Sequence, residues 1–155
     1  MRSLPDPGFA GDDGTVPEDV ASALSAYDAD PHRRRTEALA VLQRSRLLVP
    51  VVAVLGEVEH DENGLAHDKT SDMATVLMQG NDGRMALLCF TGAEPLRRWN
   101  PEGRPVPVPA PDAARAALQD GADALLVDVA GPVPFVIEGD DLRALADGFI
   151  VADLG

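Results

Sequence analysis

The sequence has few of the features that mark secreted, membrane-spanning or disulfide-stabilised proteins. Cys89 is the only cysteine, so the chain can form no internal disulfide, and it suits a reducing compartment. No apolar run approaches the about 18 residues that a membrane-spanning helix needs, and the N-terminal stretch lacks the apolar core of a signal peptide. We therefore expect a cytoplasmic protein.

Positive charge is also scarce. The chain has 26 acidic residues against 13 basic residues, which gives a formal net charge of −13, and Lys69 is the only lysine. Such a chain repels nucleic-acid phosphates and anionic lipids but tolerates a basic partner. We therefore expect neither a nucleic-acid partner nor a membrane partner.

Familiar catalytic and ligand-binding motifs are missing. The sequence has no glycine-rich phosphate loop, no nucleophile elbow and no paired-histidine zinc motif. One acidic stretch contains metal-ligand residue types, but their spacing matches no zinc or calcium signature. These residues are His60, Asp61, Glu62, His67 and Asp68. The sequence predicts no catalytic residue, no metal site and no cofactor.

What the chain does contain is an ordinary globular composition. Hydrophobic residues make up 45% and charged residues 25% of its 155 residues. A chain of this length can bury a core without disulfides or metal and suits one domain. Residues 1–15 are rich in Pro, Gly and Asp, and we expect a flexible N-terminal segment there. Residues 16–155 then form a single domain.

Hydrophobic spacing and turn residues predict both helices and strands. The predicted helices cover residues 17–27, 31–45, 91–99, 111–121 and 139–148. The predicted strands cover residues 46–55, 72–79, 84–90, 104–109, 122–129, 134–137 and 149–154. We expect an α/β (α+β) domain, in which a mixed, largely antiparallel sheet has a central hairpin and helices packed against it.

Three local features of this prediction can be checked directly. Gly83 suits the left-handed position of a three-residue hairpin loop at residues 81–83. Pro50 lacks an N–H, which places its strand at a sheet edge or at a bulge. The sequence Thr91 to Glu94 matches a capping box, in which the Thr91 side chain caps the following helix.

Cys89 is the first candidate for a functional residue. In the predicted strand it shares a face with Met85 and Leu87, and no histidine lies nearby in the sequence. A reactive cysteine needs an exposed, electropositive setting that favours the thiolate. We therefore predict that Cys89 packs in the core.

Arg97, Arg98 and Trp99 form a candidate interaction surface at the end of the short helix. Tryptophan and arginine are the residue types most enriched at binding hot spots. The alternative is structural, with Trp99 covering an edge of the core and the arginines complementing the helix dipole. Our leading hypothesis is a non-enzymatic domain that contacts an unknown protein partner.

Two further hypotheses remain open. Asp72, Arg84, Arg98 and Asp128 lie at predicted strand or helix ends, where a small-molecule or enzymatic site often forms. A deep pocket in which these groups converge would favour that hypothesis. The third is self-association through an edge strand at residues 104–108, which the prolines there oppose.

Three stretches resemble the N-terminal domain of the bacterial SseB family. They read "RLLVPVVA" (46–53), "SDMATVLMQGNDGRMALLCFTGAEPLRRWNPEGRPVPV" (71–108) and "GADALLVDVAGPVPFVIEGDDLRALADG" (121–148). With the preceding helix, the resemblance extends over residues 31–148. Its shared features are the hairpin, the short helix with its tryptophan, and an Asp-x-Ala-Gly-Pro turn between strands. The resemblance implies no catalytic residue, because the family has none established.

Overall fold

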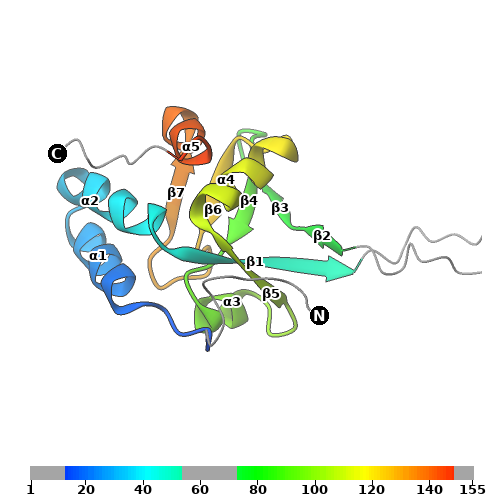
Figure 1. Cartoon of the computed structure of the whole chain (residues 1–155), viewed down its shortest axis with the longest axis horizontal. Coiled ribbons are helices and arrows are strands. Elements are labelled where there is room, and N and C mark those ends of the chain that lie inside the picture. Colours follow the sequence, from blue (N-terminus) through cyan, green and yellow to red (C-terminus); the bar gives the residue numbers. More distant parts are fainter. Residues whose placement is uncertain (1–12, 54–72, 149–155) are drawn as a thin grey trace, which may run out of the picture.

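The computed structural model describes residues 13–53 and 73–148 (Figure 1). Its helices are α1 (Glu18–Ala29), α2 (Pro31–Gln43), α3 (Ala93–Trp99), α4 (Ala110–Gln119) and α5 (Gly139–Ala146). Its strands are β1 (Arg46–Ala53), β2 (Met73–Thr75), β3 (Leu77–Gln79), β4 (Met85–Cys89), β5 (Arg104–Pro109), β6 (Ala124–Val127) and β7 (Phe135–Glu138). The predicted α/β fold, with mostly antiparallel strands, is confirmed. The predicted terminal strand at 149–154 lies outside the described residues.

The strands form two sheets that meet at one point. The first sheet has the order β2-β1-β5 and the second has the order β3-β4-β6-β7. All neighbouring strands are antiparallel except β4 and β6, which are parallel. Leu48 of β1 joins the sheets, because its N–H and C=O exchange 2.8 Å hydrogen bonds with Phe90, the residue after β4. The carboxyl ends of β4 and β6 therefore lie beside each other and next to β1.

The hairpin between β3 and β4 forms as predicted. Gly80 donates its N–H to the Arg84 carbonyl, at 2.8 Å, and Gly83 adopts a φ of +87°. A left-handed φ carries no steric cost for glycine, which explains why this residue occupies the loop position. Strand β4 is an inner strand, and both of its faces are covered: Leu87 packs in one core and Leu88 in another, as the two-sided apolar pattern indicates.

Pro50 predicted an edge strand or a bulge. The edge position is wrong, because β1 lies between β2 and β5, and the register with β5 continues without a bulge through Pro50 and Pro105. Leu48 directs its N–H toward Phe90, and residues two positions apart in a strand face the same side, so the backbone nitrogen of Pro50 also lies on the side away from β5. On that side, pairing with β2 begins only at Val51. On this side of β1, Pro50 therefore lies between the residue that bonds to Phe90 and the first residue that pairs with β2, where no N–H donor is needed. The proline-rich β5 does lie at a sheet edge, as expected.

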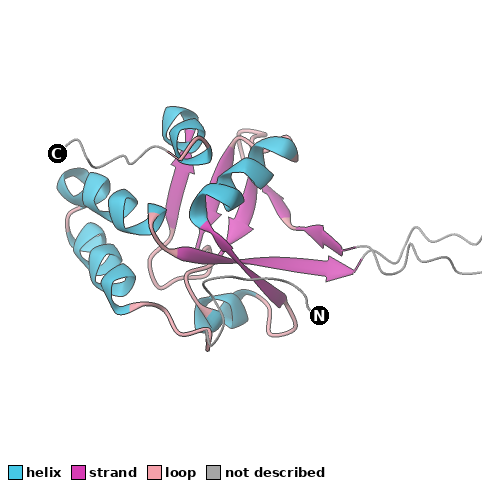
Figure 2. Cartoon of the chain, viewed as in Figure 1, coloured by secondary structure: helices cyan, strands magenta, loops and turns pink. Residues whose placement is uncertain are grey.

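Helices cover mainly one face of the second sheet (Figure 2). Leu87, Cys89 and Leu125 belong to the main core on that face, together with residues of α1, α2, α4 and α5. A smaller core lies on the other face, where Leu88 and Phe90 pack with Leu48 of β1 and Leu96 of α3. Successive β4 residues thus serve different cores, which follows from the two-residue period of a strand.

None of the helices in residues 13–53 and 73–148 is both long enough and apolar enough to span a lipid bilayer.

Candidate functional site

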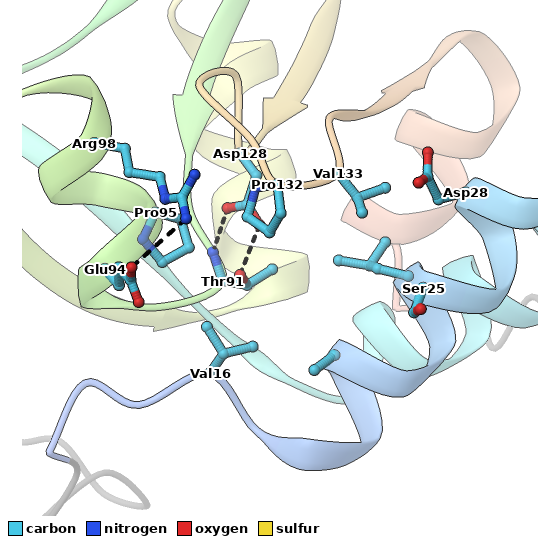
Figure 3. Close-up of a pocket in the computed structure, with 12 residues that line it drawn as sticks. Val16, Ser25, Asp28, Thr91, Glu94, Pro95, Arg98, Asp128, Pro132 and Val133 are labelled. Atoms are coloured by element: carbon cyan, nitrogen blue, oxygen red, sulfur yellow. Dashed lines mark hydrogen bonds and ion pairs between the residues drawn. The ribbon is translucent and has the colours of Figure 1, made fainter.

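A pocket of about 430 Å³ lies at the carboxyl ends of the parallel strands β4 and β6. Its walls come from α1, from the start of α3 with the turn before it, and from the turn between β6 and β7 (Figure 3). The carboxyl ends of parallel strands are a common place for ligand sites, because the strands end there and the following segments diverge. We call this cavity the larger pocket.

Asp128 and Thr91 form the floor of the larger pocket. The Thr91 N–H donates to Asp128 Oδ1 at 2.8 Å, and the Thr91 hydroxyl donates to Oδ2 at 2.7 Å (Figure 3). The two residues are 1% and 2% exposed. The carboxylate thus ties the end of β6 to the end of β4 across a buried contact.

This contact corrects the predicted capping box. Gly92, not Thr91, occupies the N-cap position of α3, and no side chain caps the helix. The Thr91 hydroxyl instead donates a charge-assisted hydrogen bond to Asp128 Oδ2, and it accepts none from the N–H groups at the helix start. The polar residue after β4 therefore joins two strands and provides no side-chain cap for the helix.

The Asp128 backbone and side chain are both in unusual states. Its φ is +57°, a conformation that non-glycine residues rarely adopt and that Asp tolerates better than most. Burial raises the pKa of the carboxyl group to about 6, although the hydrogen bonds from Thr91 act in the opposite direction. Perturbed carboxyl groups of this kind are concentrated at functional sites.

A segment before α1 forms one wall of the pocket. The Ala93 N–H donates to the Gly14 carbonyl at 2.7 Å. Arg46, which is buried, donates from Nη1 to the Thr91 carbonyl at 2.6 Å and from Nη2 to the Thr15 carbonyl at 2.9 Å. Gly14 and Thr15, which we expected to belong to a flexible segment, are thus linked to the turn before α3. Residues 1–12 lie outside the described part of the chain.

Gly92 makes this close contact possible. A Cβ atom built on Gly92 would lie 2.5 Å from Val16 Cγ2 and 2.9 Å from the Gly14 carbonyl oxygen. No side chain fits between the turn and the segment at this point.

Helix α1 provides the opposite wall through one face. Ala21, Leu24, Ser25 and Asp28 line the larger pocket, with the spacing that places residues on the same side of a helix. Leu24 is buried, whereas Ser25 and Asp28 are exposed and extend from α1 on the side of the pocket opposite α3 (Figure 3). The sequence analysis missed this wall, although its polar residues at positions 25 and 28 follow the helical spacing.

The rim is formed by charged residues of α3. Arg98 Nη2 lies 3.7 Å from Glu94 Oε2, and a Cβ built on Gly131 would lie 4.0 Å from Arg98 Nη1. The guanidinium group therefore extends from α3 toward the turn between β6 and β7. Both side chains of the pair are at least half exposed, so the ion pair is weak.

A smaller pocket of about 330 Å³ adjoins the larger one. Its lining includes Asp13, Thr15 and Arg97, and it shares Val16 and Glu94 with the larger pocket. The two cavities therefore meet across the start of α3, and we refer to them together as the paired pockets.

The family model for the SseB protein N-terminal domain matches residues 20–144, which is most of the chain. The chain belongs to the SseB family. No curated protein and no solved structure matches it. The match includes α1, α3 and the turn after β6, so this SseB domain contains most of the residues that line the larger pocket.

The predicted surface of Arg97, Arg98 and Trp99 is divided in the SseB domain. Arg98 lines the larger pocket and Arg97 lines the smaller one. Trp99 lines neither of them. Its ring lies 5.6 Å from that of Phe90 at an angle of 31°, and it packs half-buried against the smaller core. Trp99 thus covers a core edge, while the two arginines flank the paired pockets.

The four residues of the small-molecule hypothesis are also separated. Arg98 and Asp128 line the same pocket. Arg84 lies at the other end of the second sheet, before the start of β4, where it pairs with Asp82 at 3.0 Å and with Glu138 at 2.9 Å. Asp72 lies outside the described residues.

The remaining candidates provide no reactive group in the described part of the chain. Cys89 is fully buried, as predicted, and burial raises the pKa of its thiol far above the ordinary value. Its Sγ lies 3.9 Å from the Leu126 carbonyl oxygen. Residues His60 to Asp68 lie outside the described ranges, and within residues 13–53 and 73–148 no three potential ligand side chains gather around a common point.

Proposed function

We propose that this SseB domain is a non-enzymatic protein-interaction domain that binds a short, extended segment of a partner protein in the paired pockets. The observation that carries the proposal is that the two cavities adjoin across Val16 and Glu94. A ligand that crosses the start of α3 can contact both of them. Extended peptide segments have this shape and commonly place alternate side chains in neighbouring pockets.

The state of the ionisable groups supports binding over catalysis. Both Asp128 oxygens accept hydrogen bonds from Thr91, and Arg98 is paired with Glu94. The described residues that line the larger pocket include no Cys, His or Lys. Nucleophilic and acid–base mechanisms usually rely on such a residue beside the reacting group, so this lining favours binding.

The proposal moves the binding surface away from the end of α3. Trp99 belongs to the surface predicted there, yet its ring packs against that of Phe90. The apolar contact area of the paired pockets comes instead from Val16, Leu24, Pro95 and Val133. We further propose a cytoplasmic location, which is supported by the single, buried thiol of Cys89.

The test uses random peptides displayed on phage and selected on the immobilised protein. Ser25 and Ser22 are both exposed on α1, but only Ser25 lines the larger pocket. Ser25→Trp should fill the pocket and weaken a selected synthetic peptide by about tenfold or more, as measured by isothermal titration calorimetry. Ser22→Trp, the matched control, should leave the affinity unchanged.

Three outcomes would contradict the proposal. Equal binding to the wild type and to Ser25→Trp would place the peptide outside the larger pocket. Loss of binding in Trp99→Ala, with normal binding in Ser25→Trp, would show that the peptide binds at the end of α3. Failure to select any peptide that binds the wild-type protein would also count against an interaction domain.

A small molecule is the second candidate ligand, because Arg98 and Asp128 do lie in one pocket. A fragment library screened by thermal shift against the wild type, Ser25→Trp and Ser22→Trp would test it. Fragments that stabilise the wild type and Ser22→Trp but not Ser25→Trp, together with no selectable peptide, would favour this candidate.

A further inference from the structure

The larger pocket combines an apolar wall with an excess of negative charge. Val16, Leu24, Pro132 and Val133 are among its apolar lining residues. Its ionisable lining residues in the described chain are the three carboxylates of Asp28, Glu94 and Asp128 and the guanidinium group of Arg98. The cavity thus has apolar surface for a hydrocarbon stem and more acidic than basic groups around it.

The single positive charge does not cancel this excess. Arg98 lies 3.7 Å from Glu94, so one carboxylate offsets it and the lining keeps a net excess of two negative charges. Asp28 lies on the wall opposite α3, and Asp128 lies at the floor (Figure 3). The smaller pocket repeats the pattern on a smaller scale, with Asp13 and Glu94 against Arg97.

Asp128 has acceptor capacity beyond its contact with Thr91. Each of its carboxylate oxygens accepts one hydrogen bond there. A carboxylate oxygen has two lone pairs, so one acceptor position is left on each atom. Because the group is almost fully buried, water screens its charge poorly toward the cavity.

We infer that the larger pocket binds a lysine or arginine side chain of the partner segment. The aliphatic stem lies against the apolar wall, and the cationic head lies among Asp28, Glu94 and Asp128. This division matches the chemistry of long basic side chains, which bury their methylene groups while their charge stays near polar groups. It also agrees with the formal charge of −13, which draws a basic segment toward the protein and repels an acidic one.

This inference rests on the proposed function, and its experiment separates the two. Random peptides are selected on the wild-type protein, and the position with the strongest lysine or arginine enrichment is replaced by glutamine in a synthetic peptide. We expect affinity to fall about tenfold or more, because buried charge pairs at interfaces couple strongly. The same peptide should bind more weakly to Asp28→Asn and Glu94→Gln, and raising the salt concentration should weaken it further.

The control variant is Asp140→Asn on α5. The Asp140 side chain is 95% exposed, pairs with Arg143 and does not line either of the paired pockets. Asp140→Asn removes one negative charge, as Asp28→Asn does, so it shows the effect of the change in net charge alone. Affinity for this variant should equal that for the wild type.

The outcomes are distinct. Peptides that Ser25→Trp excludes but that carry no preferred basic residue would overturn this inference and leave the proposed function standing. Peptides that bind Ser25→Trp as well as the wild type would overturn both. An equal loss of affinity in Asp28→Asn and Asp140→Asn would show attraction to the overall charge and no recognition in the pocket, which also overturns the inference.

Discussion

The two ends of the second sheet hold the same hydrogen-bonding pattern in opposite surroundings. At the hairpin end, Asp82 accepts 3.0 Å hydrogen bonds from the Arg84 N–H and from the Arg84 side chain. At the pocket end, Asp128 accepts bonds from the Thr91 N–H and from the Thr91 side chain. Each carboxylate thus binds one backbone donor and one side-chain donor of a single residue.

The consequences differ because burial differs. Asp82 is exposed, and the backbone hydrogen bond from Arg84 lowers the pKa of its carboxyl group. Asp128 is buried, and desolvation raises its pKa to about 6 despite the same kind of contact. Hydrogen bonding alone therefore does not identify a functional carboxylate. The comparison shows that the surrounding walls decide whether the group is a surface turn residue or part of a pocket.

The largest expected effect concerns the packing around the pocket end. Gly92→Ala places a Cβ atom 2.5 Å from Val16 Cγ2, and backbone atoms of Gly14 and Val16 lie within 2.9 Å, so the neighbouring segment has to move. We expect a loss of about 3 kcal/mol in the free energy of unfolding, as measured by chemical denaturation. Gly80→Ala at the hairpin end is the matched control, because its Cβ meets only Asp82 Oδ1 at 3.3 Å and the Arg84 carbonyl at 3.8 Å. Equal losses at both ends would contradict the close packing at Gly92.

The second effect removes the carboxylates themselves. Asp128→Ala leaves the buried Thr91 N–H and hydroxyl without their acceptor, and we expect it to lower the free energy of unfolding by about 2 kcal/mol. Asp82→Ala removes the same pattern in solvent, where water replaces the lost acceptor. Its unfolding midpoint should stay close to that of the wild type. If Asp128→Ala were equally harmless, the contact with Thr91 would not hold the two strands together.

The third effect is a pH dependence that only the buried carboxylate should show. Because the folded-state pKa of Asp128 is raised from 3.8 to about 6, the folded protein binds this proton more tightly than the unfolded chain does. Its contribution to stability is therefore fully present below the unfolded pKa and is lost as the pH rises through about 6. Between about pH 7 and about pH 5, the wild type should gain about 1 kcal/mol relative to Asp128→Asn.

Carbon-detected NMR titration of the aspartate side chains checks the same point without unfolding. The Asp128 carboxyl carbon should titrate near pH 6, whereas that of Asp82 should titrate below the ordinary value of 3.8. Titration of both carboxyl groups at the same pH would mean that the burial of Asp128 has little electrostatic effect.

The sequence was sufficient for the elements whose determinants are local. Gly83 marked the hairpin loop, and the two-sided apolar pattern of residues 85–90 marked an inner strand. The burial of Cys89 followed from the same pattern. These features depend on residues close together in the chain, so short-range propensities and periodicity describe them well.

The site depended on contacts that no local pattern contains. The local pattern assigns Thr91 to a helix cap, which is wrong. Its actual partner, Asp128, lies 37 residues away in the sequence. Likewise, Pro50 suggested an edge strand, although an inner strand can accommodate it. It lies between the contact with Phe90 and the pairing with β2, and this position exists only in the folded chain. Arg98 and Asp128 were both identified from their positions at element ends, but only the fold shows that they share a pocket with α1.

The smallest effect is expected for the ion pairs at the hairpin end. Arg84 contacts Asp82 and Glu138, yet the side chains of all three are more than one third exposed. Exposed pairs gain little because water screens the attraction and both side chains lose freedom. Arg84→Ala and Glu138→Gln should therefore leave the midpoint of thermal unfolding within experimental error at moderate salt. A decrease as large as that of Asp128→Ala would mean that the hairpin end is held as firmly as the pocket end, which would remove the physical reason for placing the functional site at only one of them.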